Sequence, residues 1–581
     1  MDSGTRGGGK SNETDFFLIL QKDDPAQGTS RKHEPLPQGS INILSMKHFW
    51  LYCGMAALAV SCGDSGDDPG PRPAKTLPLT VRISGGSYTE AADAGTAGKE
   101  YPVTLAEGSA AGLFVVHADG TSADPVKLTL GAGGVWSAAQ GELPEYTEGD
   151  RYFACYPFEA AGKDDVEVSA TTDDAFFAAP IAGYKPAADQ SEGYAASALM
   201  TAAGKVTATE TSATLELRMT PRTALAVLTM PATKYIFDNE PALPDYVVPA
   251  TNVSFDGFTP YTAEDGSYLY SVNPAEAPVL KGSYGDGQQW TQETSGATAG
   301  KWTSYAVNGG TVEKSHTLRI GDFFLANGNL LSKDAEASEV AAAHVVGIVF
   351  QTDPERIDAA DKEALGGAAH GVVIATKSAE PAAWYTRKDR DESEIGIAPF
   401  FSEEDDLRTT AQKTDACIRG YYYTRQILTE RTSDVGKGQY PIFAAMESFA
   451  ATAGGPAEEV ATTGWYLPAI GQWFDVMRNL VGAELSADNV TDYGGGTYYY
   501  PQEEKPLDVH KLLNEAMKKV SVENKTEYPE DDNSAFYYCS SVLSTSGAHV
   551  FSPNRGVGTF RFNIMSGAKD NRYDARAMLT F

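Results

Sequence analysis

The segments Ala213-Thr-Leu-Glu-Leu-Arg-Met219 and Ala224-Leu-Ala-Val-Leu-Thr-Met230 decide the fold class. Apolar and polar residues alternate in the first segment, which is typical of a β-strand with one buried face. The second segment is almost continuously apolar, as in a strand that is covered on both faces. A half-buried strand followed directly by a fully buried one indicates a β-sandwich.

Further strands are predicted on the N-terminal side of this pair. Leu79–Ile83 alternates with period two, and Gly112–Val116 is a short apolar run that ends at a turn. Arg151–Phe158 is rich in aromatic residues, and Pro157 limits it to a sheet edge or to a strand that ends there. These strands place a first β-sandwich at residues 77–230.

Residues 231–318 hold a second β-rich region. Its predicted strands are Tyr246–Val248, Val253–Phe255, Tyr268–Tyr270 and Trp302–Val307. Asp286-Gly287 and Asn308-Gly309 are dipeptides that favour tight turns. A second β-sandwich fits this length.

Residues 319–581 combine strands with helices. Apolar residues recur at three- and four-residue steps behind Pro468, which predicts one face of an amphipathic helix formed by Ile470, Trp473, Phe474, Met477 and Leu480. A second helix is expected at Leu507–Val520, and a final strand at Arg576–Phe581 should place Phe581 in the core. The chain is therefore predicted to be mainly β, with one or two N-terminal β-sandwiches followed by an α+β domain.

A short segment near residue 50 predicts export. Met46-Lys47-His48 is basic, and Phe49–Val60 is uncharged but too short to span a bilayer. This order is typical of a secretion signal at residues 46–61, with a buried core helix and an uncleaved anchor as the alternatives. Ala59-Val60-Ser61-Cys62 resembles a bacterial lipobox, which implies that Cys62 carries a lipid and becomes the new N-terminus.

The residues on either side of this signal lack the periodicity of folded elements. Residues 62–76 form an acidic, proline-rich tether. In this tether Asp64, Asp67 and Asp68 look like the export signal of surface lipoproteins in the Bacteroidota, which favours the cell surface over the periplasm. Residues 1–45 are polar and glycine-rich, so we interpret them as a disordered extension upstream of a misassigned start codon.

Charge and cysteine content exclude some classes of partner and fold. The net charge of -32 repels phosphate backbones, so nucleic acid is not an expected partner. Cys53 would leave with the signal and Cys62 would be lipidated, which leaves Cys155, Cys417 and Cys539. An odd number cannot all pair internally, and both a Cys417–Cys539 bridge and buried free thiols stay open.

Four motifs follow one another in the first sandwich: Gly112–Phe114, Tyr152–Phe158, Ser197–Ala202 and Arg218–Pro221. Their order resembles the N-terminal domain of the fimbrillin family, the subunits of Bacteroides and Porphyromonas type fimbriae. The resemblance implies transthyretin-like β-sandwiches and a structural role in a fimbrium. Arg218–Pro221 departs from the family, whose version of this motif contains a histidine.

A second series of motifs lies in residues 319–581. It consists of Gly321–Phe324, Val346–Phe350, His370–Ala375, Trp384-Tyr385, Gly464–Trp473, Phe536–Ser541 and Ala575–Phe581. This series resembles the lectin-like C-terminal domain of many surface proteins of the same group, which is related in fold to C-type lectins and formylglycine-generating enzymes. The resemblance implies an adhesive C-terminal domain.

No pattern of catalytic residues stands out. HExxH, GxSxG and a glycine-rich phosphate loop in a strand-to-helix setting are absent from the sequence. His344, His370 and His549 lie in apolar or glycine-flanked strand contexts that favour a structural role, and Cys417 with Cys539 does not reproduce the cysteine motif of the formylglycine enzymes. We therefore expect neither an enzyme nor a cofactor.

Candidate ligand residues are acidic or aromatic. Glu403–Asp406 and Glu530–Asn533 supply carboxylates, but neither matches the sugar-binding tripeptides of C-type lectins, so we interpret them as solvated loops and expect no metal site. Aromatic faces stack on sugars and anchor protein interfaces. If a ligand site exists, it is expected among aromatic loop residues, namely Tyr421, Tyr422, Tyr423, Tyr498, Tyr499 and Tyr500.

The fimbrillin resemblance also implies a mode of assembly. In that family, proteolysis after a basic residue removes an N-terminal strand, and a strand of a neighbouring subunit fills the groove. Arg82 and Lys99 bracket the corresponding position.

Two functions follow from these features. The first is a cell-surface fimbrial accessory or tip subunit, joined to other fimbrial subunits by donor-strand exchange and presenting a C-terminal adhesion domain. The alternative is a stand-alone outer-membrane lipoprotein that binds glycans or host proteins without polymerising. In both, the lipid anchor is the sole contact with the membrane.

Overall fold

A computed structural model describes residues 76–91, 98–138, 143–402, 404–494, 497–501, 507–529, 536–552, 559–562 and 567–581. For residues 492–494, 497–499, 501 and 559–562 only the backbone is described. The predicted signal peptide, Cys62 and the export signal at Asp64, Asp67 and Asp68 lie outside the described residues. Everything described belongs to one compact unit that begins at residue 73.

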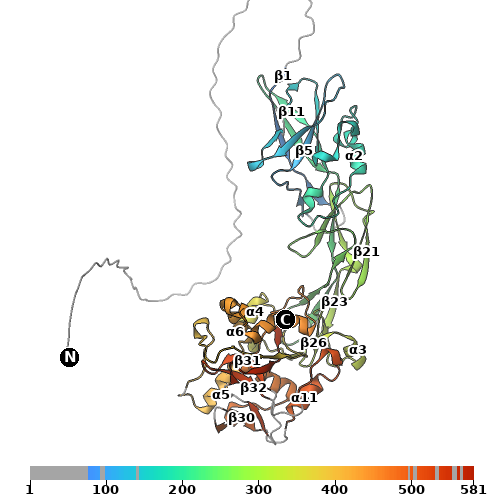
Figure 1. Cartoon of the computed structure of the whole chain (residues 1–581). Coiled ribbons are helices and arrows are strands. Elements are labelled where there is room, and N and C mark those ends of the chain that lie inside the picture. The colour runs from blue at the N-terminus through green and yellow to red at the C-terminus, as the bar shows by residue number, and fades with distance from the viewer. Residues whose placement is uncertain are drawn as a thin grey trace, which may run out of the picture. The chain divides into compact units, whose positions relative to one another are not determined.

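The N-terminal β-sandwich contains a six-stranded and a three-stranded sheet (Figure 1). The first sheet has the order β13 (Thr220–Pro221), β10 (Met200–Ala203), β9 (Arg151–Tyr156), β5 (Ala110–Val116), β6 (Val126–Leu130) and β7 (Trp136–Ala138). The second has the order β11 (Lys205–Ala208), β12 (Ala213–Arg218) and β2 (Leu79–Ser84), and β1 (Thr76–Leu77) pairs with β8 (Tyr146–Thr147). Leu113 of one sheet and Leu215 of the other are buried in the same core.

These strands confirm the alternation that was recognised in the sequence. Buried and more exposed residues alternate along β12. Strand β9 lies inside the six-stranded sheet and ends at Tyr156, so Pro157 marks a strand end. On the other face of this sheet, Phe114 and Phe153 pack against Phe176 and Phe177. Phe176 ends α1 (Asp173–Phe176), and Phe177 joins it to α2 (Ala178–Gly183).

A second pair of sheets follows. The six-stranded sheet has the order β18 (Tyr261–Thr262), β19 (Tyr268–Val272), β14 (Ala224–Thr229), β22 (Lys301–Ala306), β3 (Ser87–Glu90) and β4 (Tyr101–Pro102). The three-stranded sheet has the order β17 (Ser254–Phe255), β20 (Val279–Tyr284) and β21 (Gln288–Glu293). Asp286-Gly287 forms the predicted turn between β20 and β21.

Strand β14 corrects the predicted boundary at residue 230. It pairs with β19 and β22, so it belongs to the second pair of sheets. Leu225 and Val227 on one face join the N-terminal core, whereas Ala226 and Leu228 on the other face join the second core. The apolar run at residues 224–230 is therefore covered on both faces because it separates two cores.

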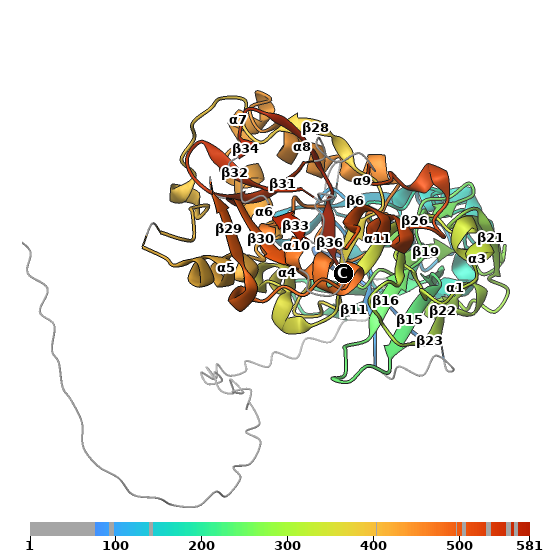
Figure 2. The same ribbon diagram turned by 90° about the horizontal axis from the view of Figure 1, so that it is seen from below.

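The predicted boundary at residue 318 is also crossed. The sheet of β16 (Tyr246–Pro249), β15 (Ala232–Phe237) and β23 (Thr311–His316) is labelled in Figure 2. Tyr235, Phe237, Tyr246 and Val248 of this sheet are buried in the same cluster as Phe581. This sheet thus packs against the C-terminal part of the chain.

The C-terminal part contains three further sheets. The first has the order β25 (Leu330–Leu331), β24 (Phe323–Leu325), β26 (Val345–Gln351), β27 (Val372–Ala375) and β36 (Met578–Thr580). The second has the order β28 (Ala379–Ala383), β35 (Arg572–Ala575), β31 (Tyr537–Val542), β32 (Gly547–Phe551) and β34 (Gly567–Ala568). The third has the order β29 (Thr491–Gly494), β30 (Thr497–Pro501) and β33 (Thr559–Phe562). Pairing of β36 with β27 closes the first sheet, and Phe581 is buried as predicted.

Nine helices of this part are described between the sheets. They are α3 (Ala337–Ala342), α4 (Ala359–Ala364), α5 (Leu407–Ala416), α6 (Gly420–Glu430), α7 (Thr432–Gly436), α8 (Pro441–Glu447), α9 (Phe449–Ala453), α10 (Ile470–Val476) and α11 (Val509–Ala516). The predicted helix behind Pro468 is present, and Ile470, Trp473, Phe474 and Met477 are buried. It is not amphipathic, because α10 is buried on all sides before it continues into a π-helical turn at Met477–Val481. The α11 helix is shorter than predicted and buries Leu513, with Met517 and Val520 buried beyond its end.

The described chain is mainly β, as predicted. No helix in the described part is both long enough and apolar enough to cross a bilayer.

Candidate functional site

The first described strands form the candidate assembly site. Strand β2 lies at the edge of its sheet and pairs in parallel with β12, from Leu79 opposite Ala213 to Ser84 opposite Arg218. The side chains of Leu77, Leu79 and Val81 are buried in the N-terminal core. This edge strand therefore fills the core but is held by one backbone ladder.

After Ser84 the chain crosses into the second pair of sheets. Gly86 makes the crossing possible, because a Cβ atom there would lie 2.6 Å from the carbonyl oxygen of Met219. Strand β3 then lies between β22 and β4. The Tyr88 hydroxyl is buried within hydrogen-bond distance of Thr223 (2.7 Å) and Ser271 (3.3 Å), and burial raises the pKa of Tyr88 to about 12.

Residues 76–90 thus insert side chains into the N-terminal core and into the second pair of sheets. Their removal would leave the backbone of β12 and of β22 without these partners and would empty the sites of Leu79, Val81 and Tyr88. Exposed backbone donors and acceptors beside an apolar groove can accept a strand from another chain. The two ladders and the apolar sites of this segment make it the candidate site for pairing with another chain.

The two candidate cleavage residues lie in different surroundings. Arg82 is inside β2 and pairs with Glu216. Lys99 follows β3 and lies outside any strand. Its carbonyl oxygen accepts a hydrogen bond of 2.9 Å from Trp302 Nε1, and its ammonium group lies 3.3 Å from Asp265. A protease binds a backbone outside a strand ladder more readily than one held in a ladder, so Lys99 is the more accessible of the two candidates.

The tyrosines predicted to form a ligand surface do not lie in a described aromatic loop. Tyr421, Tyr422 and Tyr423 belong to the α6 helix and pack against the C-terminal core, with Tyr423 buried. The guanidinium of Arg419 lies 3.9 Å from the ring centre of Tyr422. These contacts occur because the helix turns the three consecutive residues toward different neighbours.

Tyr500 is only 2% exposed and lies edge-on to Phe474, with the ring centres 5.5 Å apart. It is therefore a core residue, which corrects its placement in a ligand site. The side chains of Tyr498 and Tyr499 lie outside the described residues.

The acidic segment before α5 has a structural role. Asp406 Oδ1 accepts a hydrogen bond of 2.7 Å from the backbone N–H of Thr409 and caps the helix. Asp405 forms an ion pair of 2.7 Å with Lys413. Hydrogen bonding lowers the pKa of both carboxyl groups. Within the described ranges no cluster of side chains suits a metal ion, while Glu403 and Glu530–Asn533 lie outside them.

The cysteines are free and buried. Cys155, Cys417 and Cys539 form no disulfide in the described structure, which decides between the two alternatives in favour of thiols. Burial raises the pKa of Cys155 and of Cys417 to about 12 and raises that of Cys539 well above its usual value. Thiols with such pKa values are poor nucleophiles at neutral pH.

The three histidines that we interpreted as structural differ in exposure. His344 is exposed, whereas His370 and His549 are buried. His370 Nε2 lies 3.1 Å from the carbonyl oxygen of Pro244. His549 stacks on Phe400, with the ring planes 10° apart.

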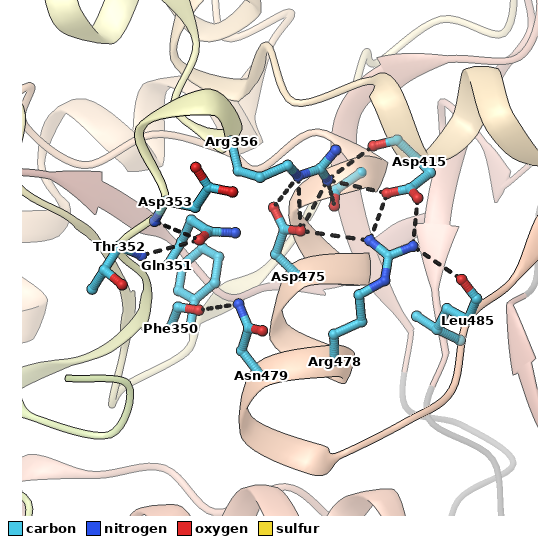
Figure 3. A network of polar contacts seen from close by, with 11 residues as sticks. Phe350, Gln351, Thr352, Asp353, Arg356, Asp415, Asp475, Arg478, Asn479 and Leu485 are labelled. Carbon is cyan, nitrogen blue, oxygen red and sulfur yellow. Dashed lines mark hydrogen bonds and ion pairs between the residues drawn. The ribbon is translucent and has the colours of Figure 1, made fainter. Parts of the chain in front are cut away.

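A network of two arginines and two aspartates was not predicted from the sequence. Figure 3 shows Arg356 and Arg478 pointing toward Asp415 and Asp475. Arg356 Nε donates to Asp475 at 3.0 Å, and Arg478 Nη1 donates to Asp415 at 2.8 Å. Burial is the main cause that raises the pKa of Asp475, and Arg356 opposes it.

This network joins α5, α10 and the turn at Pro354–Arg356. Its charges balance, and each carboxylate is paired with an arginine, so it holds three segments together without presenting a net charge to a substrate. The spacing of Asp475 and Arg478 was the sole sequence signal, because Arg356 and Asp415, their partners, lie 119 and 63 residues away in sequence.

Comparisons with known proteins bear on this architecture. No protein-family model matches the chain. A Bacteroides ovatus protein named "Putative fimbrium tip subunit Fim1C" is 24% identical over 528 residues, which cover 83% of this chain and 89% of the relative. A crystal structure of a fimbrial protein from Bacteroides ovatus matches 88% of this chain and 100% of its own length, with 22% identity and a TM-score of 0.57. The chain has the fold of that fimbrial protein.

The likeness extends over most of the architecture. The part of this chain that the match leaves out is shorter than residues 319–581. The shared fold therefore reaches into the C-terminal part. The chain that contains β2, β3 and the three C-terminal sheets therefore shares its fold with a fimbrial protein.

Proposed function

We propose that this chain is a structural and adhesive subunit of cell-surface fimbriae, at the tip or in another accessory position. The observation that carries the proposal is the segment Thr76–Glu90, which fills two regions of the molecule while β2 lies at a sheet edge. The fold of a fimbrial protein and the name of the Fim1C relative support the same role.

Assembly would proceed by exchange of this segment. Cleavage after Lys99 releases β1, β2 and β3, and a strand from a neighbouring fimbrial subunit pairs with β12 and β22 in their place. The exchange is favourable because the incoming strand restores the backbone hydrogen bonds and fills the apolar sites of Leu79 and Val81.

The C-terminal part would be the adhesive end. The motifs between Gly321 and Phe581 resemble those of a lectin-like domain, and the large apolar core of this part includes residues of the sheet of β15, β16 and β23. A part of this size hinders the addition of a further subunit above it, which suits the tip of a filament. The chain would reach the cell surface as an outer-membrane lipoprotein through a lipid on Cys62.

The chain would act without catalysis. The buried thiols of Cys417 and Cys539, with their raised pKa values, support a structural role for both residues.

Two measurements on piliated cells test this proposal. Immunogold labelling is expected to find the chain at fimbrial tips, and a fatty-acid analogue is expected to label Cys62. Labelling confined to the cell envelope would favour the stand-alone lipoprotein, and a precursor that takes up no fatty acid before cleavage at Lys99 would contradict the anchor.

A further inference from the structure

A pocket of about 290 Å³ lies beside the sheet of β15, β16 and β23. Thr233, Val248 and Val312 come from these three strands and stand opposite one another in register. Val312 is apolar but 62% exposed. It lies on the face of the sheet that packs against the C-terminal core at other positions. The three side chains line the pocket with a small, largely apolar surface.

The turn between β24 and β25 forms one wall. Asn327 and Asn329 of this turn line the pocket. Gly328 between them has φ near +81°, and a Cβ atom there would lie 2.5 Å from Val460. The turn is therefore packed too closely for a side chain at its centre.

Two buried tyrosine hydroxyls fix this wall to the sheet. The Tyr246 hydroxyl donates to the carbonyl oxygen of Gly328 at 2.9 Å, and the Tyr235 hydroxyl donates to Asn329 Oδ1 at 3.0 Å. The backbone N–H of Leu330 in turn donates to the Tyr235 hydroxyl at 3.0 Å. The amide groups of the turn are thus held in position before any ligand arrives, which lowers the entropy cost of binding.

The turn between β20 and β21 forms another wall. It contributes Tyr284, Asp286 and Gln288. The backbone N–H of Gly285 donates to the carbonyl oxygen of Thr251 at 2.6 Å, which ties the turn to the loop between β16 and β17. Tyr284 is held by its hydroxyl, which accepts a hydrogen bond of 3.1 Å from Asn308 Nδ2.

The chemistry of the lining suits a sugar. Two asparagines, a glutamine, a carboxylate and two threonine hydroxyls offer donors and acceptors at the rim, beside apolar surface and one tyrosine ring. A sugar ring has hydroxyl groups at its edge and C–H groups on its faces, so it can use both kinds of surface. The volume is at the small end of the range of roughly 300–1,000 Å³ for ligand pockets, which limits the occupant to a small unit.

The charge of the lining side chains narrows the class of sugar that the pocket can bind. The described residues that line the pocket include Asp286 but no lysine, arginine or histidine. A carboxylated or sulfated sugar would meet Asp286 without a cation to balance its charge. The pocket therefore discriminates against acidic sugars.

We propose that this pocket binds one neutral sugar unit at the end of a glycan. The inference rests on the adhesive role proposed above and assigns the adhesive contact to the junction of β15, β16 and β23 with the turns at Asn327–Asn329 and Tyr284–Gln288. It places that contact away from the tyrosines of α6.

The test uses the full chain on an array of glycans that end in neutral hexoses, neutral N-acetylhexosamines, sialic acid or sulfated sugars. Binding is expected on neutral ends, with Val312→Arg and Asp286→Ala each weakening it at least tenfold. Val279→Arg is the matched control, because Val279 is also an exposed valine (41%) but lies outside the pocket lining, and it should leave binding unchanged.

Two results would overturn the inference: binding confined to acidic ends, and binding that persists in Val312→Arg. Immunogold labelling of the Val312→Arg variant separates this inference from the proposed function. If the variant is still found on fimbriae but no glycan binds to the wild-type chain, the inference fails and the fimbrial role stands. If glycans bind as expected but the chain never enters fimbriae, the fimbrial role fails instead.

Discussion

The hydroxyl of Tyr246 donates a hydrogen bond of 2.9 Å to the carbonyl oxygen of Gly328, and this bond joins β16 to the turn between β24 and β25. Tyr246 is buried, and its pKa is raised by desolvation. The bond links a strand of the middle region to the C-terminal part of the chain, so it contributes both to folding and to the wall of the proposed sugar pocket.

Replacing this hydroxyl should destabilise the protein. Tyr246→Phe leaves the carbonyl oxygen of Gly328 without its buried donor, and we expect the free energy of unfolding to fall by about 1–3 kcal/mol. Urea unfolding followed by tryptophan fluorescence measures the change. Val279→Thr, at an exposed site, should change stability by less than about 0.5 kcal/mol. An unchanged midpoint for Tyr246→Phe would show that the bond is not formed in solution.

The arginine–aspartate network should be sensitive to the loss of one member. Asp475→Ala leaves Arg356 and Arg478 facing each other without the buried carboxylate between them, so unfolding should become easier by about 3–5 kcal/mol. The matched control is Arg319→Ala, which breaks the exposed pair with Asp334 and should cost less than about 1 kcal/mol. Similar losses for the two variants would contradict the assigned role of the network.

Because His549 is buried, we expect the free energy of unfolding to decrease in acid. Burial lowers its pKa from 6.5 to about 3, so the unfolded chain binds a proton more readily than the folded chain between these values. The stabilisation is complete above pH 6.5 and decreases as the pH falls toward 3, by roughly 2 kcal/mol between pH 7 and pH 5.

Removing the imidazole should remove that dependence. As the pH falls from 7 to 5, the unfolding free energy of wild type should decrease by this amount relative to that of His549→Phe. His344→Phe controls for the change of side chain at an exposed histidine. Parallel pH profiles for wild type and His549→Phe would refute the assignment.

Assembly should depend on Lys99 and not on Arg82. Lys99→Gln removes the candidate basic residue that lies outside any strand, and we expect at least a tenfold loss of the chain from purified fimbriae. Arg82→Gln is the control, because it alters a basic residue whose backbone is paired in β2. Lys99→Gln loses one exposed ion pair with Asp265, which costs about 1 kcal/mol or less, so both variants should remain folded. Normal incorporation of Lys99→Gln would exclude cleavage at this residue.

Strands were predictable from the sequence because their periodicity is local. The alternation at Leu79–Ile83 and at Ala213–Met219 corresponds to β2 and β12, and the apolar run at Ala224–Met230 corresponds to the fully covered β14. Their pairing was not predictable. Strand β14 has partners from Tyr268–Val272 and Lys301–Ala306, and nothing in its own sequence indicates which sheet it joins.

The α10 helix shows why polar residues misled the prediction. An amphipathic helix has a solvated face opposite its apolar one, but the polar residues Gln472 and Asp475 are both buried. Gln472 donates to the Tyr466 hydroxyl at 2.9 Å, and Asp475 accepts from Arg356, which is 119 residues away in sequence. Burial of a polar side chain depends on such distant partners, which periodicity does not reveal.

The proposed sugar pocket was missed for a similar reason. Its lining comes from Thr233, Val248 and Val312 together with two turns that are far apart in the chain. Each segment alone is an ordinary strand or turn. The predicted tyrosine triplet, in contrast, was conspicuous in sequence because its members are adjacent, yet adjacency in a helix directs them to different neighbours.

The mature N-terminus of the chain in purified fimbriae tests the central claim most directly, because strand exchange requires that β1, β2 and β3 have been released. Mass spectrometry of the fimbrial protein is predicted to find a chain that begins at Glu100. A fimbrial chain that begins at Cys62 and retains residues 76–99 would contradict the account.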